Sequence, residues 1–105
     1  MVRKGQGRII ERIPGYEFKD LAFRFTQKKM QPLQVTINPS DKAAELVSHE
    51  GEEFNLVMEG CIIVNLNGKE ILLEEGDSIY FDSSIPHGQR CGGDKPGTFI
   101  TFICE

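Results

Sequence analysis

The chain has 105 residues, 39% of them hydrophobic, which suits one domain with a modest core. Its formal net charge is −4, so its surface is a poor match for nucleic-acid phosphates, and direct nucleic-acid binding is not expected. No apolar run approaches the roughly 18 residues of a membrane-spanning helix, and no signal-peptide core follows the basic N-terminus. We therefore expect a cytoplasmic single domain over residues 1–105, with residues 1–7 as a loose arm.

Charges and cysteines are unevenly placed along the chain. Residues 1–29 hold eight of the 12 Lys and Arg residues but only three of the 16 acidic ones. This basic section is either a partner-facing arm or a solvated surface, and the second is favoured without a nucleic-acid motif. Cys61, Cys91 and Cys104 are an odd number without C-x-x-C spacing, which indicates reduced thiols rather than a disulfide framework or a zinc finger.

Short alternating segments separated by Gly and Pro turns predict an all-β fold, either a sandwich or a barrel. A helical turn is expected only at residues 43–46, and the Asn67-Gly68 pair predicts a tight hairpin because both residues tolerate positive φ. Strands are expected at residues 8–13, 16–18, 22–26, 33–37, 53–59, 61–66, 69–73, 78–81 and 98–104.

The two histidines of the chain define its candidate site. His49 and Glu53 stand four residues apart, and in an extended strand they would share one face, with Gly51 between them leaving room. His87 lies far downstream, after Pro86, and the fold would have to bring it to the other two. Two imidazoles and one carboxylate can bind a divalent metal and leave positions open, as in non-haem iron and catalytic zinc sites. The alternative is a hydrogen-bonded polar cluster without a metal.

Residues 48–60 resemble the first of the two motifs of the cupin superfamily. That motif has two histidines flanking one residue, then a glutamate and a glycine. Here His49, Glu53 and Gly60 match the second histidine, the glutamate and the glycine, while Val47, which cannot bind a metal, occupies the position of the first histidine.

Residues 76–87 resemble the second motif. Gly76 matches its start and His87 its metal-binding end. Asp82 and Ser84 stand where the family often has proline and glycine, and Cys91 where it often has asparagine. Within the superfamily the two motifs look most like the C-terminal sensor domains of bacterial helix-turn-helix regulators, although the 105 residues show no DNA-binding unit. The chain is expected either as a free-standing relative or as part of a longer protein.

The resemblance implies a double-stranded β-helix, which is a jelly-roll barrel with a ligand pocket in its mouth, often assembled as a homodimer. It also implies a divalent metal ion (Zn, Ni, Fe or Mn) on three protein ligands, His49, Glu53 and His87. Gln89, Cys91 and Tyr80 are candidate ligand-contacting residues, with ordinary packing as the alternative for each.

Three functions remain open on this basis. The favoured one is a module that binds a small-molecule effector for a transcriptional regulator. The second is a small metal-dependent enzyme of dioxygenase, isomerase or decarboxylase type. The third is a dimerisation domain with a vestigial pocket.

Overall fold

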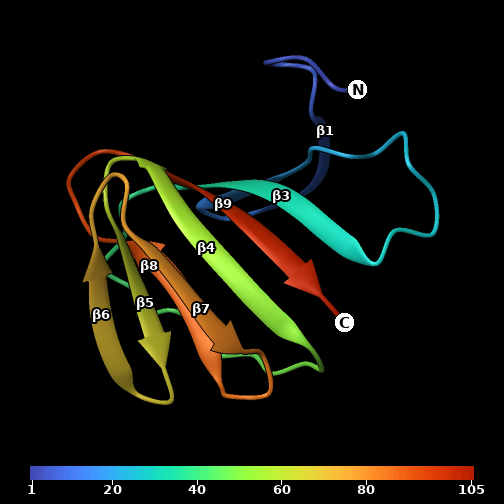
Figure 1. Ribbon diagram of the computed structural model, residues 1–105. Helices are drawn as coiled ribbons and strands as arrows, with labels where there is room; N and C mark the ends of the chain where they lie inside the picture. The colour runs from blue at the N-terminus through green and yellow to red at the C-terminus, as the bar shows by residue number, and fades with distance from the viewer.

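The protein is described by a computed structural model over residues 1–105, which contains nine strands and no helix (Figure 1). None of the chain forms a helix long and apolar enough to cross a membrane. The strands are β1 (Arg8–Ile13), β2 (Tyr16–Asp20), β3 (Met30–Ile37), β4 (Glu52–Glu59), β5 (Ile62–Leu66), β6 (Lys69–Leu73), β7 (Ser78–Asp82), β8 (His87–Cys91) and β9 (Gly97–Cys104).

The strands form two antiparallel sheets that face each other, which confirms the predicted jelly-roll barrel. Six strands pair in the order β1-β2-β3-β9-β4-β7 and three in the order β6-β5-β8. In Figure 1 the larger sheet runs diagonally from β7 through β4 and β9 to β3. Alternate residues of both sheets point inward and form one apolar core: Leu33, Val35, Ile37, Val57, Ile62, Val64, Leu73, Phe81, Cys91 and Phe99.

The tight hairpin predicted at Asn67-Gly68 joins β5 to β6. Both residues have positive φ, 52° for Asn67 and 95° for Gly68. The Asn65 side chain accepts a hydrogen bond from the Gly68 N–H at 2.8 Å, which closes the turn locally. The pairing of β5 with β6 therefore follows from the turn chemistry of two residues.

Two predicted elements are wrong. Residues 22–26 form turns instead of a strand, because the Asp20 carboxylate accepts the Ala22 N–H and the Ala22 carbonyl accepts the Phe25 N–H. Residues 43–46 form no helical turn and run without regular structure to Val47, which pairs with His87. A segment of four residues gains too little from helical hydrogen bonds to resist such a pairing.

Candidate metal centre

The three candidate metal ligands come from three places in the fold. Glu53 is the first inward-facing residue of β4, and His87 is the first residue of β8. His49 precedes β4, and its backbone N–H donates to the carbonyl of Ser83 in the β7–β8 connection. Residues 49–51 lie outside the strand, and Gly51 has a φ of 98°, so His49 does not reach Glu53 along one strand face as predicted. The turn at Gly51 folds it back instead.

The structure nevertheless brings these three side chains together. Glu53 Oε1 lies 3.5 Å from His49 Nε2 and 3.4 Å from His87 Nε2. The two imidazole rings meet edge to face, with centroids 5.1 Å apart. One donor atom from each residue lies within 4.8 Å of the others. Glu53 and His87 are buried, while His49, with 31% of its side chain exposed, is the solvent-facing member. A ligand would therefore approach from the His49 side.

Backbone carbonyls orient both imidazoles. His87 Nδ1 lies 2.8 Å from the carbonyl oxygen of Ile85, and His49 Nδ1 lies 3.1 Å from that of Glu50. A carbonyl oxygen can only accept, so each Nδ1 carries the hydrogen and each neutral ring keeps the lone pair on Nε2. Fixing the tautomer through the remote nitrogen is how proteins prepare a histidine for a metal.

The second oxygen of Glu53 is held by two side-chain amides. Asn55 Nδ2 donates to Glu53 Oε2 at 3.1 Å, and Gln89 Nε2 donates to the same oxygen at 2.9 Å. Gln89 Nε2 also donates to Asn55 Oδ1 at 2.8 Å, while Asn55 Nδ2 donates to Thr101 Oγ1 at 2.9 Å. These bonds lock the carboxylate plane and leave Oε1 turned towards the two imidazoles.

A hydroxyl extends this network to β2. The Tyr16 hydroxyl donates to the backbone carbonyl of Gln89 at 2.8 Å. Burial raises the pKa of Tyr16 above 10.0, although the positive charge of Arg90 opposes the shift. The phenol therefore remains a donor over the physiological range and ties β2 to the strand that carries Gln89 and His87.

The donor set fits a divalent metal ion better than a simple ion pair. Separations of 3.4 and 3.5 Å exceed the roughly 2.7–2.9 Å of a charge-assisted hydrogen bond. Glu53 Oε1 and either Nε2 atom, each about 2.1 Å from one metal, would subtend roughly 110° at it, near the tetrahedral angle. Nitrogen and carboxylate donors suit zinc, iron, nickel and manganese alike, so the geometry does not select among them.

The other predicted site residues fall in different places. Gln89 belongs to the cluster through Glu53. Cys91 packs in the apolar core, and its thiol donates to the Lys95 carbonyl at 3.0 Å. Tyr80 is 62% exposed on the outer face of β7, because its neighbour Phe81 is the residue that faces the core, and the structure does not bring it to the cluster. Val47 is exposed and supplies only its backbone to His87.

Asn55 and Thr101 were missed by sequence reasoning. Each is a buried polar residue on the inward face of a strand, β4 and β9 respectively. The signal in the sequence was the position of Asn55 two residues after Glu53, which places both side chains on the same face of the strand. The hydroxyl of Ser83 is also buried, and it has no hydrogen-bond partner within the protein. It lies next to the backbone of His49, whose N–H donates to the Ser83 carbonyl.

Several known proteins resemble this chain in sequence and fold. The family model described as a cupin domain matches residues 33–103, which is more than half of the chain. A curated relative, the HTH-type transcriptional regulator PuuR of Escherichia coli (strain K12), is 36% identical over 52 residues, covering 50% of this chain and 28% of PuuR. The chain thus matches less than a third of the length of that relative.

Two solved structures resemble the whole barrel. Hydroxypropylphosphonic acid epoxidase from S. wedmorenis superposes with a TM-score of 0.82 at 25% identity, over 98% of this chain and 58% of the epoxidase. The Cupin_2 domain of an XRE family transcriptional regulator from Enterobacter cloacae superposes with a TM-score of 0.76 at 20% identity, over 87% of this chain and 97% of that domain. The likeness to the regulator domain is evidence for the fold alone.

Proposed function

We propose a function from the premise that this chain belongs to the cupin domain family, whose model matches residues 33–103. The barrel binds one divalent metal ion through His49, Glu53 and His87, and the bound metal helps to hold a small polar or anionic effector. The observation that carries this proposal is the carboxylate of Glu53, with Oε2 held by two amides and Oε1 facing two oriented Nε2 atoms.

Three protein donors leave coordination positions for an exogenous ligand. Such positions favour oxygen donors of small anions, while the exposed edge of His49 gives the ligand access from solvent. The side-chain amides of Gln89 and Asn55 already donate to Glu53, and that of Gln89 also donates to Asn55. These two residues therefore position the carboxylate rather than bind the ligand. Burial of this network is the reason why the metal would be held in one geometry.

We assign the domain to effector sensing in a transcriptional regulator, in the cytoplasm. The support is the 36% identity to the regulator PuuR and the regulator-like motif pair at residues 48–60 and 76–87. Within this proposal the 105 residues act as one sensor domain, and DNA contact belongs to another part of the regulator.

The experiment is a thermal-shift screen of tag-free protein against small carboxylates, phosphates and sugars, with and without Zn²⁺, Ni²⁺, Fe²⁺ or Mn²⁺. An effector at about ten times its Kd adds about 1.4 kcal/mol, which raises the Tm of a domain of this size by roughly 5 to 10 °C. We expect this shift only when the metal is present. If the rise in Tm disappears in Glu53→Gln but persists in Glu52→Gln, whose side chain lies on the outer face of the same strand, the effector binds at the metal site.

A library that yields no metal-dependent stabiliser, while the protein converts one of the compounds, would contradict the sensing assignment. That outcome would favour the second candidate, a small metal-dependent enzyme. Its specific support is the open coordination of a two-histidine, one-carboxylate site and the 25% identity, over 98% of this chain, to an epoxidase. Turnover that disappears with chelator and in Glu53→Gln would establish it.

A further inference from the structure

Strand β1 lies at one edge of the six-stranded sheet and pairs with β2 alone. All six of its residues are exposed, and they include three isoleucines, Ile9, Ile10 and Ile13, at 41%, 47% and 45%. In Figure 1 the strand lies away from β5, β6 and β8, so the smaller sheet does not cover it. An exposed edge strand with apolar side chains is a template on which another strand can pair.

The backbone of β1 has groups available for such a strand. In an edge strand of an antiparallel sheet, alternate N–H and C=O groups point away from the sheet. Ile10 has no partner on β2, because the register shifts between Ile9 and Glu11. Every strand pair in this sheet is antiparallel, so an added strand that continues the pattern would place its C-terminal end beside Arg8.

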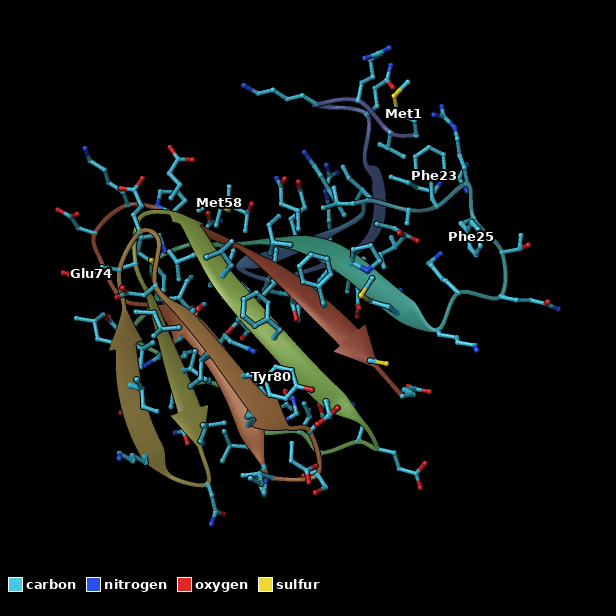
Figure 2. All side chains as sticks on the ribbon, in the orientation of Figure 1. Met1, Phe23, Phe25, Met58, Glu74 and Tyr80 are labelled. Carbon is cyan, nitrogen blue, oxygen red and sulfur yellow. The ribbon has the colours of Figure 1, made fainter.

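Two guanidinium groups without carboxylate partners lie at the Arg8 end of this edge. The Cζ atoms of Arg8 and Arg24 lie 4.5 and 4.8 Å from the centre of the Phe23 ring. Arg24 also donates to the Met1 carbonyl at 2.7 Å, and Figure 2 shows Phe23 beside Met1. Neither arginine makes an ion pair within the chain. The ring holds two like charges near each other, and an anion in contact with both would offset their repulsion.

The carboxylate opposite Arg8 in the sheet is already engaged. Asp20 is the register partner of Arg8, but its Oδ1 accepts a backbone N–H at 2.8 Å and its Oδ2 lies 3.4 Å from Lys28 Nζ. At the other end of β1, Arg12 is paired with Glu17, with 3.2 Å between Nε and Oε2. The free positive charge of this edge therefore lies at its Arg8 end.

We propose that β1 binds an extended segment of another protein, which adds to the larger sheet as an antiparallel strand and carries carboxylates at its C-terminal end. Backbone hydrogen bonds to β1 hold the segment, its apolar side chains cover the isoleucines, and its carboxylates pair with Arg8 and Arg24. Nucleic acid phosphates would suit the two arginines, but a nucleic acid has no backbone that continues a sheet and no aliphatic side chains. The inference does not depend on the metal centre.

The test is the binding of a fluorescent seven-residue peptide of alternating threonine and valine, with blocked ends and with glutamate in place of its last two threonines. We expect saturable binding to the full chain, and slower deuterium exchange of the amides of residues 8–13 at saturation. A peptide with glutamate in place of the first two threonines has the same composition and should bind at least about tenfold more weakly. A proline at the central position removes a backbone N–H and should also weaken binding.

Charge reversal on the protein tests the proposed ion pairs. Arg8→Glu should raise the peptide Kd at least about tenfold, because it sets a like charge against the glutamates. Lys69→Glu is the matched control, since Lys69 is an exposed lysine on β6 of the other sheet, and it should leave the Kd unchanged. If Arg8→Glu fails to fold by circular dichroism, Arg24→Glu, in the turns after β2, replaces it.

Three results would overturn the proposal. The first is equal binding of the two glutamate peptides, or an unchanged Kd in the Arg8→Glu variant. The second is exchange at residues 8–13 that the peptide does not slow, or that slows with rising protein concentration alone, because a second copy would then cover β1. The third is duplex DNA that binds through Arg8 while the peptide does not bind, which would assign the arginines to phosphates.

Discussion

At the scale of single residues, the carboxylate of Glu53 decides what this barrel can do. It is 5% exposed, and a buried carboxylate is costly unless hydrogen bonds or cations surround it. Two amides at Oε2 meet part of this need, while the imidazoles at Oε1 stand at 3.4 and 3.5 Å, too far for strong hydrogen bonds. A metal ion between these atoms would complete the compensation, which is why we place it there.

Gln89 is predicted to set metal affinity without touching the metal. Gln89→Ala removes one of the two amides that hold Glu53 Oε2, so the carboxylate gains freedom to turn. Losing such an outer partner typically costs 10–100-fold in affinity, and we expect about that increase in the metal Kd by isothermal titration. The control is Gln34→Ala on the outer face of β3, which should leave the Kd unchanged. Equal Kd values for the two variants would show that the amide is dispensable.

At the scale of elements, the approach to β4 is shaped by the backbone at Gly51. Its φ is 98°, a conformation that L side chains rarely adopt, and a Cβ there would collide with the carbonyl oxygen of Cys104. The Gly51 carbonyl accepts the N–H of Ser83 at 2.9 Å, and His49 N–H donates to Ser83 at 3.0 Å. Gly51 therefore couples the entry to β4 with the β7–β8 connection that leads to His87.

Substituting Gly51 should disrupt both stability and the site. We expect Gly51→Asn to lower the free energy of unfolding by at least about 2 kcal/mol, because left-handed strain and a clash with backbone act together. The matched control is Gly68→Asn, at a φ of 95° with no atom near the added Cβ, where Asn should cost about 1 kcal/mol or less. Urea unfolding measures both. A cost for Gly51→Asn no larger than that for Gly68→Asn would refute the role of the close approach.

The β7–β8 turn should show a defined pH dependence. Hydrogen bonds from the Ser84 N–H and hydroxyl, at 2.9 and 2.8 Å, lower the pKa of Asp82 below its ordinary value of 3.8. A lowered pKa means that the ionised form stabilises the fold above about pH 4, and that this contribution is lost as pH falls through the lower, folded-state pKa.

Asp82→Ala should therefore lower the urea midpoint at pH 7 and make progressively less difference below pH 4. Asp94→Ala, which removes an exposed loop carboxylate without a hydrogen bond in the chain, is the control for general charge effects. A difference between wild type and Asp82→Ala that is as large at pH 3 as at pH 7 would show that ionisation of Asp82 is not involved.

At the scale of the whole molecule, local patterns predicted the barrel well because turn chemistry and alternation are short-range. Asn67-Gly68 specified its hairpin, and His49, Glu53 and His87 were singled out by residue type and motif spacing. Residues 22–26 alternate like a strand, yet the carboxylate of Asp20 caps a turn there. Whether this segment forms a strand or a turn depends on side-chain hydrogen bonds, and the spacing of apolar residues does not reveal them.

The residues that support Glu53 and the outward orientation of Tyr80 could not be predicted for a different reason. In the sequence, a lone polar residue such as Asn55 only interrupts the apolar pattern of its strand. Its hydrogen-bond partner Thr101 is 46 positions away in the chain and lies beside it only because β9 pairs with β4. Tyr80 and Phe81 are adjacent aromatics, so alternation alone could not say which of them faces the core. Only the pairing of β7 with β4 turned Tyr80 outward and joined it to Phe54 and Phe102 in one apolar row.

The most direct test of the central claim is the metal content of tag-free protein, equilibrated with a divalent metal and then desalted. We expect close to one ion per chain for the wild type and for Glu52→Gln, and a loss of bound metal in Glu53→Gln, which keeps the side-chain shape but not the charge. A wild type that retains no metal, or a Glu53→Gln variant that retains as much as the wild type, would contradict the assignment of His49, Glu53 and His87 as a metal site.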